Sequence, residues 1–495
     1  MSRVRRVVIV GGGTAGWMTA AGLSKSLGPV LDITLVESDV IGTVGVGEAV
    51  IPLIKSFHAL LELDEAEFMK AVNGTFKLGI EFENWGQLGD SYFHPFGPTG
   101  VEAWAAQFHH YWLKARRQGQ ETDTLRRFSL EASMASAGKF TLASDPQPQF
   151  AYHFDASLYA RLLRKLSEDH GVRRVEGKVV DVDVHPDSGH IQSVQMESGE
   201  TIEGDLFVDC SGFRGLLIQQ VLETPWEDWS HWLRNDRAVA VQTESAGAPA
   251  PYTRCTARPS GWQWKIPLQN RVGNGLVYCS QYLSDDDAKK NLLDNLEGDP
   301  ITEPRLIRFR TGRRANQWVK NCVAVGLSSG FLEPLESTSI HLIQNSVLRL
   351  VRMFPADGID QTEVRQFNNE TTTEIEQIRD FIILHYKVTQ RGDSPYWIDC
   401  RDMEVPEHLA HKIALFERNA RAVRENNEMF RERSWAAVML GQGIEPAGYH
   451  PFVDNLSDPQ LQGLMQQVKT NVARIVAASP SHQEFLRGYC AAGER

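Results

Sequence analysis

The sequence predicts an α/β protein in three parts: a Rossmann-like, dinucleotide-binding unit, a second sheet inserted on the substrate side, and a mainly helical C-terminal part. Three observations predict this fold. A β-branched run and a glycine-rich turn precede an Ala- and Leu-rich helix within residues 4–27, strand patterns fill residues 238–282, and beyond residue 355 the chain has only helical, charged patterns. We therefore divide the chain into residues 1–350, with interleaved nucleotide-binding and substrate-side elements, and residues 351–495.

The N-terminal segment carries the pattern on which the fold prediction rests. Val4–Val10 is a run typical of a buried parallel strand, and Gly11–Gly16 follows it with the motif G-x-G-x-x-G. Trp17–Leu27 then reads as a helix and Leu31–Val36 as a second strand, which ends at the acidic Glu37. A strand, the glycine motif, a helix, a strand and an acid in this order predict a dinucleotide site.

Each residue type in the motif has a physical role. Gly11 permits the tight turn, Gly13 lets the backbone approach a pyrophosphate, and Gly16 lets helix and strand pack closely. The free N–H groups and dipole of the helix start attract phosphate, and Glu37 can accept hydrogen bonds from a ribose. The motif leaves open whether the dinucleotide is NAD or FAD. The candidate ligands are Gly11, Gly13, Thr14, Ala15, Gly16 and Glu37.

Two further segments favour FAD. The glycine-rich stretch Ile41–Pro52 predicts a loop close to the ligand and adds Gly47, Glu48 and Ala49 to the cofactor-binding candidates. A later strand runs into Asp209–Gly215, which contains Asp-x-Ser-Gly and resembles a further dinucleotide contact. A helix and several strands between two such nucleotide elements are typical of large flavoprotein oxidoreductases.

Composition and charge exclude several classes of protein. The chain has 495 residues and a net charge of −12, which does not favour a nucleic-acid partner. It contains no apolar run long enough to span a bilayer, and the first strand leaves no room for a signal peptide. The six cysteines are scattered without a C-x-x-C pair, so we expect no metal site and no disulfide framework. These features predict a reduced, cytoplasmic protein without a membrane partner.

The remaining patterns predict the other elements in chain order. A strand over Thr75–Trp85 holds Lys77, an aromatic loop follows at Tyr92–Gly97, and a helix from about Glu336 to Met353 begins beside Ser337, Thr338 and Ser339, which have the side chains of capping residues. Helices are also predicted over residues 53–72, 101–136 and 157–170, and strands over residues 175–184, 191–196, 201–208 and 321–326.

Four motifs together resemble those of the flavin-dependent tryptophan-halogenase family, over roughly residues 5–450. They are the Gly11–Gly16 turn, Phe76-Lys77-Leu78-Gly79, Trp262-x-Trp264-x-Ile266-Pro267, and Glu333-Pro334-Leu335-Glu336-Ser337-Thr338. The resemblance implies the fold of the FAD-binding flavoprotein monooxygenases. It implies that reduced FAD, O₂ and a halide ion, bromide or chloride, give hypohalous acid. A separate flavin reductase would supply the reduced FAD.

The resemblance also implies roles for particular residues. Lys77 would hold the halogenating species as a haloamine or by a hydrogen bond, and Glu336 would polarise that species and help remove the proton from the ring. Halide would lie on the N–H groups of Thr338 and Ser339 at a helix start. His94 and Phe96 would sandwich the substrate ring, and Trp262 and Trp264 would separate flavin from substrate.

Two departures bear on the substrate and the halide. Ser339 stands where tryptophan-specific members carry glycine, and Arg424–Glu432 lacks the Tyr-Tyr-Glu segment with which they grip the free amino acid. We therefore expect an indole-type or other electron-rich arene without a free amino-acid head, or one held on a larger carrier, with a lean towards bromide.

Two alternative functions stay open from the sequence. One is a flavin-dependent aromatic monooxygenase that does not halogenate, and another is a flavin-binding protein that has lost its chemistry. The oligomeric state, with a homodimer as one option, is not determined by the sequence.

Overall fold

The computed structural model describes residues 3–40, 47–101 and 104–493. It divides into two compact units through which the chain passes repeatedly. Unit 1 comprises residues 1–72, 154–234 and 309–376, and unit 2 comprises residues 73–153, 235–308 and 377–495. The last boundary falls inside helix α9 (Gln361–Lys387).

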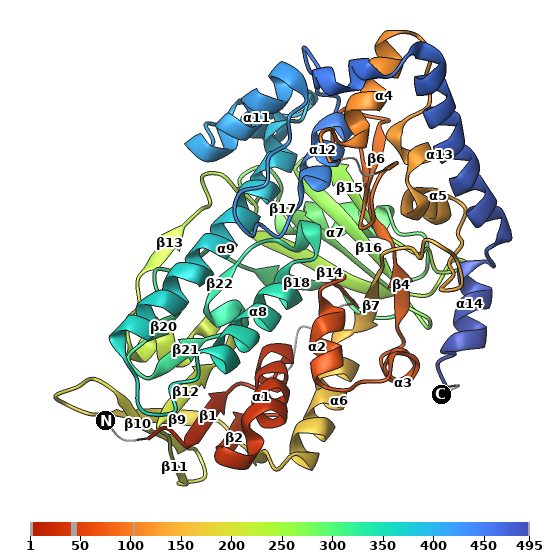
Figure 1. Cartoon of the computed structure of the whole chain (residues 1–495). Coiled ribbons are helices and arrows are strands. Elements are labelled where there is room, and N and C mark those ends of the chain that lie inside the picture. The colour runs from red at the N-terminus through yellow and green to blue at the C-terminus, as the bar shows by residue number, and fades with distance from the viewer. Residues whose placement is uncertain (1–2, 41–46, 102–103, 494–495) are drawn as a thin grey trace. The chain divides into compact units, whose positions relative to one another are not determined.

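Unit 1 is built on a six-stranded sheet in the order β20-β21-β12-β1-β2-β8 (Figure 1). The pairs are parallel except β20 with β21, as an α/β unit requires. The strands are β20 (Trp318–Val319), β21 (Cys322–Ala324), β12 (Leu206–Asp209), β1 (Arg6–Val10), β2 (Asp32–Glu37) and β8 (Arg173–Glu176).

Helices and two small sheets complete unit 1. Helix α1 (Thr14–Leu27) packs on β1 and β2 and also contacts α6 (Ala156–Asp169) and α8 (Ser339–Arg352) (Figure 1). The other elements of unit 1 are β3 (Gly47–Ala49), α2 (Ile54–Leu60), α3 (Glu65–Ala71), the antiparallel sheet of β9 (Val179–Val184), β10 (Ile191–Met196) and β11 (Thr201–Glu203), and the sheet of β13 (Trp226–Asp228), β19 (Gly312–Arg314) and β22 (Gly330–Phe331).

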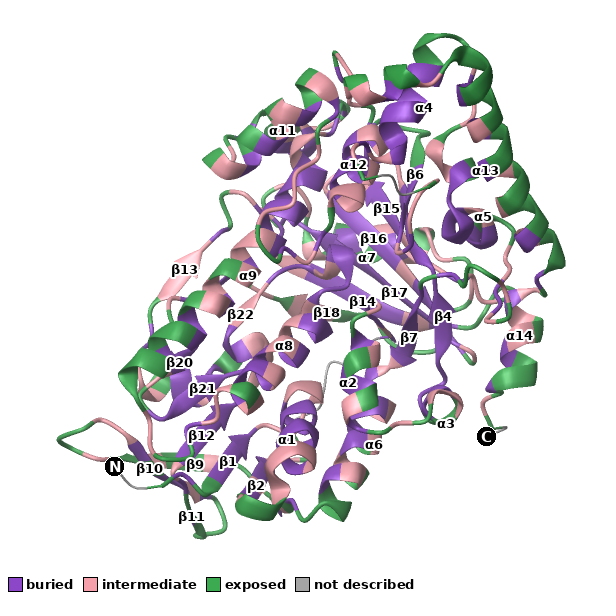
Figure 2. Cartoon of the chain, in the orientation of Figure 1, coloured by how far each residue is buried: buried purple, intermediate pink, exposed green. Residues whose placement is uncertain are grey.

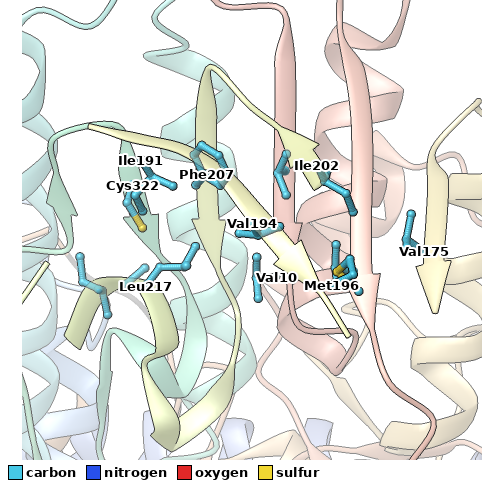
Figure 3. Close-up of a cluster of buried hydrophobic side chains, with 13 residues drawn as sticks. Val10, Val175, Ile191, Val194, Met196, Ile202, Phe207, Leu217 and Cys322 are labelled. Atoms are coloured by element: carbon cyan, nitrogen blue, oxygen red, sulfur yellow. The ribbon is translucent and has the colours of Figure 1, made fainter. Parts of the chain in front are cut away.

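A buried apolar cluster joins the six-stranded sheet to the β9–β11 sheet (Figure 3). Val10 and Phe207 come from the large sheet, whereas Val194 and Met196 come from β10. Burying these side chains supplies the main driving force for the contact, at about 1.5–3 kcal/mol for each large side chain. The cluster fixes the strands whose ends carry the glycine turn.

Unit 2 is built on a seven-stranded sheet in the order β18-β14-β17-β16-β15-β5-β6. Every pair is antiparallel except β15 with β5, and Figure 2 shows that these central strands are largely buried. The strands are β18 (Arg305–Arg308), β14 (Arg237–Thr243), β17 (Val272–Tyr278), β16 (Gly261–Pro267), β15 (Thr253–Arg258), β5 (Gly79–Glu83) and β6 (Ser91–Pro95).

Helices and one short strand pair surround this sheet. Helix α7 (Asp285–Asp294) packs on β14 and β17, and α12 (Glu432–Gly441) packs on β6. The strand pair is β4 (Thr75–Lys77) with β7 (Ala151–Asp155), and the remaining helices are α4 (Phe108–Arg117), α5 (Leu130–Ser136), α10 (Pro395–Asp402), α11 (Glu407–Asn419), α13 (Asp458–Ala478) and α14 (His482–Tyr489).

The structure changes several local predictions. The segment Tyr92–Gly97, expected as a loop, is mostly strand β6, and the strand expected over residues 175–184 is two strands, β8 and β9. The strand expected over residues 75–85 is two strands, because the backbone N–H of Leu78 leaves the ladder and donates to the Pro251 carbonyl (2.8 Å). The helix expected over residues 53–72 is interrupted between α2 and α3. The helix expected from Glu336 begins only at Ser339, because Ser337 has a left-handed backbone (φ 60°).

Two sequence predictions bear on the rest of the chain. The predicted helices beyond residue 355 are present as α9 to α14, and no strand lies between them among the residues that the structure describes. Residues 41–46 of the predicted glycine-rich loop lie outside the described residues. In the described part of the chain, no helix is both long and apolar enough to cross a membrane.

Candidate functional site

The glycine turn between β1 and α1 is shaped by backbone contacts that exclude side chains. Gly11 has φ +114°, and a methyl group on it would lie 2.3 Å from the Cys210 carbonyl oxygen. A methyl group on Gly16 would lie 1.8 Å from the carbonyl oxygen of Gly11. Both positions therefore need glycine: the first for its backbone angle and the second for the contact of helix with turn.

The start of α1 has the features of an anion site. Gly13 is its N-cap residue and offers no side chain to cap the helix, so the first-turn N–H groups of Thr14 and Ala15 are uncapped by it. A methyl group on Gly13 would meet nothing within 4 Å, so a ligand can approach the backbone there. The turn thus fits the pyrophosphate of a dinucleotide.

Glu37 lies at the end of β2, directly over the turn. A methyl group on Gly12 would fall 1.6 Å from its Oε2, and Nε of Arg174 donates to its Oε1 (2.6 Å). Nε1 of Trp17 lies 3.4 Å from Oε2. The carboxylate is therefore oriented beside the proposed pyrophosphate position, where a ribose hydroxyl would follow.

The predicted residues Gly47, Glu48 and Ala49 form β3, also in unit 1. Glu48 is partly buried, and burial raises the pKa of its carboxyl group to about 7. A carboxyl group with this pKa exists in both protonation states at neutral pH.

The Glu333–Thr338 motif forms a buried turn before α8. Pro334–Glu336 is a 3₁₀ turn, and the Glu336 side chain is 1% exposed. Ser337 adopts the left-handed conformation that ends the turn and lets α8 begin in a new direction. Sequence reasoning found Glu336 through the motif, and the turn explains how a glutamate can be buried there.

The expected hydroxyl cap of α8 is absent. Thr338 occupies the N-cap position, but no side-chain hydrogen bond caps the helix, because its backbone is helical instead of extended. The buried Oγ1 of Thr338 has no hydrogen-bond partner among the described residues. A 14-residue helix with an uncapped start and a spare buried hydroxyl is suited to an anion, on the two residues Thr338 and Ser339 that the sequence singled out.

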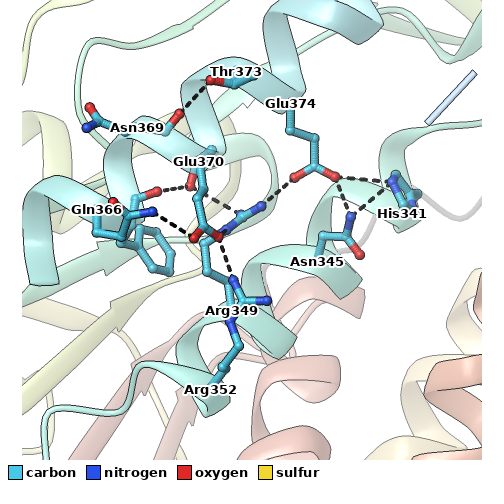
Figure 4. Close-up of polar contacts among 11 residues, drawn as sticks. His341, Asn345, Arg349, Arg352, Gln366, Asn369, Glu370, Thr373 and Glu374 are labelled. Carbon is cyan, nitrogen blue, oxygen red and sulfur yellow. Dashed lines mark hydrogen bonds and ion pairs between the residues drawn. The ribbon is translucent and has the colours of Figure 1, made fainter. Parts of the chain in front are cut away.

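A polar network anchors this end of α8 to α9 (Figure 4). Oε1 of Glu374 lies 3.2 Å from Nε2 of His341, and its Oε2 accepts a hydrogen bond from Nη2 of Arg349 (2.9 Å). Burial would raise the pKa of Glu374, but the hydrogen bonds and charges of His341 and Arg349 outweigh it and lower the pKa to about 2. The Glu374 carboxylate is therefore ionised at neutral pH, and it ties both the first and the last turn of α8 to α9.

Lys77 is the central side chain of the site in unit 2. It ends β4, is 0% exposed, and places its Nζ 5.1 Å from the centre of the Phe96 ring. The backbone N–H of Phe96 donates to the Leu78 carbonyl (3.1 Å), which ties the ring to the strand segment carrying the lysine. An ammonium group on an aromatic face is stabilised by the ring quadrupole, by about 2 kcal/mol when desolvated.

A neutral polar group formed by His153, Thr75 and Thr253 lies near Lys77. His153 contacts Oγ1 of Thr75 and of Thr253, each at 2.9 Å. Burial, and then the charge of Lys77, lowers the pKa of His153 well below its usual value, so this histidine is neutral. Oγ1 of Thr75 also donates to the carbonyl of Pro267 (2.7 Å), which links the Trp-x-Trp-x-Ile-Pro strand to the lysine strand.

Two aromatic residues that sequence reasoning missed pack beside His94. The rings of Phe381 and Phe430 are stacked at 3.7 Å and 22°, and their centres lie 5.8 Å and 6.2 Å from that of His94. Phe430 falls inside Arg424–Glu432, the segment that the sequence analysis noted only for its missing tyrosines. His94 is therefore part of a packed aromatic group with Phe381 and Phe430.

The buried acid of the segment Arg424–Glu432, Glu428, forms a structural ion pair. Glu428 forms an ion pair with Lys412, both almost fully buried, and Nζ of Lys412 also lies 4.3 Å from the Trp435 ring centre. Nε of Arg424 donates to the backbone carbonyl of Glu428 (2.8 Å). The carboxylate of Glu428 is thus engaged within unit 2.

Trp262 and Trp264 lie on β16, with ring centres 6.1 Å apart. Trp264 packs flat against Gly275 of β17, where a methyl group would lie 2.1 Å from the indole ring. Its buried Nε1 has no hydrogen-bond partner in the part of the chain that the structure describes. Trp262 instead joins the aromatic cluster around Trp85.

The sequence-predicted residues therefore fall into two groups. Unit 1 holds Gly11, Gly13, Thr14, Ala15, Gly16, Glu37, Gly47, Glu48, Ala49, Glu336, Thr338 and Ser339, and unit 2 holds Lys77, His94, Phe96, Trp262 and Trp264. No group of three or more His, Cys, Asp or Glu side chains suited to a metal ion occurs among the described residues.

Comparisons with known proteins identify the family. The model of the tryptophan halogenase family matches residues 6–458. Tryptophan 6-halogenase SttH of Streptomyces toxytricini is 37% identical, over 99% of this chain and 98% of its own. Two solved flavin-dependent halogenases superpose along the whole chain: Xcc4156 of Xanthomonas campestris (51% identity, TM-score 0.98, 100% of both chains) and BrvH of Brevundimonas sp. BAL3 (48%, 0.94, 99% and 100%).

These matches cover the mixed α/β architecture and the motifs of both units. Enzymes of this family act on an aromatic substrate with reduced FAD, O₂ and a halide ion, and a separate flavin reductase generally provides the reduced FAD. The chain belongs to the tryptophan halogenase family and is a flavin-dependent halogenase.

Proposed function

We propose that this enzyme halogenates an electron-rich, indole-type arene without a free amino-acid head, and that hypohalous acid is relayed to Lys77. The observation that carries the proposal is the fully buried amine of Lys77 beneath the Phe96 ring. An amine can hold an electrophilic halogen as a haloamine or by a hydrogen bond, and burial keeps that species away from water.

The glycine turn, Glu37 and Gly47–Ala49 would hold FAD. Reduced FAD, O₂, a halide ion and a proton together yield oxidised FAD, water and hypohalous acid, which is the chemistry that the cofactor supplies. Gly13 and the uncapped start of α1 fit its pyrophosphate. The protein's own contribution is to position the cofactor and to keep the product of this chemistry from diffusing away.

Lys77 and Glu336 carry the proposed halogen transfer. The halogen–oxygen bond of hypohalous acid breaks as a bond from the halogen to a ring carbon forms, and the ring proton passes by way of Glu336 to the hydroxide, which leaves as water. Where Lys77 holds the halogen as a haloamine, its nitrogen is the leaving group and regains a proton. A buried carboxylate such as Glu336 stabilises the positive charge that develops on the ring and accepts its proton.

The halide would lie at the start of α8. A halide ion needs only N–H or O–H donors, and Thr338 offers a spare buried hydroxyl beside the uncapped helix start. We lean towards bromide over chloride, since bromide is easier to oxidise.

Replacing Thr338 with valine tests this placement. We expect Thr338→Val to raise the half-saturating halide concentration about 10- to 100-fold, the effect of losing one hydrogen bond to a charged group. The folded state should lose no stability, because the hydroxyl has no partner among the described residues. Halide titrations of product formation and urea unfolding measure the two quantities. An unchanged halide dependence would place the halide elsewhere.

The proposed substrate follows from the aromatic group in unit 2. His94 and Phe96 would sandwich the substrate ring, and each aromatic contact would add about 0.5–1.5 kcal/mol beyond area burial. Phe381 and Phe430 stack on each other beside His94. Selecting a free amino acid would also need partners for its carboxylate and ammonium, because burying them unpaired is costly. Glu428, the buried acid of the segment that replaces the Tyr-Tyr-Glu grip, is already paired with Lys412.

A direct competition checks the substrate class. With indole and L-tryptophan at equal concentration, we expect halogenated indole to predominate by about tenfold or more, which corresponds to 1.4 kcal/mol of transition-state discrimination. The products are quantified by mass spectrometry, separately in bromide and in chloride. A preference for tryptophan would show that an amino-acid grip exists elsewhere in unit 2.

The function as a whole is tested by a reconstituted reaction. The protein is mixed with a flavin reductase, NADH, FAD and a panel of indoles and phenols, with bromide, chloride or neither. We expect halogenated products only when halide is present. Hydroxylated products that form without halide would support an aromatic monooxygenase instead. Catalytic oxidation of NADH by the protein alone would contradict the need for a separate reductase.

We also propose a cytoplasmic location. All six cysteines are buried, and their scattered positions in the sequence suggest no disulfide framework, as is usual where the cell keeps thiols reduced.

A further inference from the structure

We propose that Glu131, acting with Gln149 and Arg433, is a positioning residue that holds the Phe96–Gly97 turn over Lys77 and so determines how much halogenating species reaches the substrate. The inference rests on the role proposed for Lys77, and it assigns a function to a buried acid that no motif contains. All of its parts lie in unit 2.

The carboxyl group of Glu131 packs directly against the backbone of Gly97. Glu131 lies in α5 and is 2% exposed, its Oε1 accepts the backbone N–H of Gln149 (2.8 Å), and its Oε2 accepts the Ser129 hydroxyl (3.3 Å). A methyl group on Gly97 would lie 1.8 Å from Oε1 and 2.4 Å from Oε2. Gly97 therefore sits flush against the carboxyl group, and any side chain there would displace one or the other.

Arg433 completes the support from α12. Its Nη2 donates to the carbonyl of Phe96 (3.0 Å) and to Oε1 of Gln149 (3.2 Å), while Glu131 holds the backbone of the same Gln149. The turn is thus held at Gly97 by the acid and at Phe96 by the guanidinium group. The Phe96 ring, 5.1 Å from the Lys77 amine, depends on both contacts for its place.

Glu131 lies in the first turn of α5, where the helix start also favours an acid, so the test must separate its contact with the turn from this local role. Burial raises the pKa of Glu131 to about 7, opposed by its hydrogen bonds and by Arg433, so the folded protein bears a cost to keep it ionised. One oxygen of this carboxyl group meets Gly97 and holds the backbone of Gln149, whose side chain shares Arg433 with the Phe96 carbonyl, whereas the other oxygen accepts from Ser129 at the start of the same helix. Misplacing a reacting neighbour by about 1 Å can cost as much as 10²-fold in rate.

The test compares Glu131→Gln and Glu131→Ala with the control Glu121→Gln. Glu121 is also buried in unit 2 and also accepts backbone N–H groups, from Thr122 and Asp123 (2.9 Å each), but it contacts Lys469 instead of the Phe96 turn. Three quantities are measured for each variant: product formed per flavin oxidised, hypohalous acid captured by an external trap, and the Kd of indole without flavin. Urea unfolding shows that each variant is folded.

We expect Glu131→Ala to lower product per flavin about tenfold and to raise the trapped hypohalous acid correspondingly, with weaker indole binding and unchanged flavin oxidation. Glu131→Gln, which keeps the shape and one acceptor, should recover part of this loss, and Glu121→Gln should match the wild type. Gly97→Ala should behave like Glu131→Ala, and the double variant should be no worse than Glu131→Ala alone, because the clash is removed.

The proposal is overturned if Glu131→Ala gives the same ratio of product to trapped hypohalous acid as Glu121→Gln. It is also overturned if the losses of product caused by Gly97→Ala and Glu131→Ala are additive in the double variant. The same assay is run on Lys77→Ala. Product formation by that variant would refute the role of Lys77 itself, whereas a loss of product there with unaffected Glu131 variants would refute only the positioning role.

Discussion

Lys77→Ala abolishes ring halogenation while flavin oxidation continues: this is the result with the largest expected effect. The loss should be at least about 10³-fold, within the range for removing a group that holds or transfers the reacting species. The flavin chemistry should persist, since the nucleotide motif belongs to unit 1 and Lys77 to unit 2. Product is measured by mass spectrometry, and hypohalous acid and peroxide by trapping.

Two further variants sharpen this prediction. Lys77→Arg keeps the cation but presents a guanidinium group that is always protonated, so it can donate a hydrogen bond but cannot form a haloamine. Residual activity of the arginine variant would favour the hydrogen-bonded species, and complete loss would favour the haloamine.

Lys114→Ala is the matched control, because Lys114 is also a buried lysine of unit 2, bonded to the carbonyls of Val453 and Leu456. Wild-type product from Lys77→Ala would contradict its role.

Glu336→Gln should lower halogenation by about 10²-fold or more, the scale of losing one preorganised electrostatic group. The amide keeps the size of the buried side chain but can neither carry a negative charge nor accept the ring proton. Single-turnover rates with supplied hypohalous acid would isolate the halogen-transfer step from flavin chemistry.

The control for this substitution is Glu370→Gln. Glu370 belongs to the same unit and accepts hydrogen bonds from Arg349 and Arg352, whereas the Glu374–His341 contact is formed by other side chains (Figure 4). This variant should retain most of the activity. An equal loss in both variants would indicate general disturbance of α8 instead of a chemical role for Glu336.

The local elements of the fold could be predicted from the sequence. The glycine turn follows from residues 4–37, because strand period, backbone freedom and helix propensity each act over a few neighbouring residues. The same holds for the strands of residues 238–282 and the helices beyond residue 355. Lys77 and Glu336 are different: their individual patterns were weak, and only the combination of four motifs singled them out.

Only the tertiary structure shows where the backbone hydrogen bonds of Leu78 go and whether Thr338 caps α8. Leu78 breaks the predicted strand because Pro251 supplies a carbonyl from a distant segment, and Thr338 fails to cap α8 because the left-handed Ser337 changes the approach of the chain. Pro251 lies far from Leu78 along the chain, so no local window contains the first cause, and no residue type in the motif predicts a left-handed backbone at Ser337.

The same limit explains the residues that sequence reasoning missed. Phe381 and Phe430 contact His94 although both lie far from it along the chain. Glu131 contacts Gly97 from a separate helix. Sequence patterns report how a residue relates to its neighbours along the chain. An aromatic group, or an acid packed against a glycine, arises from contacts between distant segments that form only when the elements of each unit pack together.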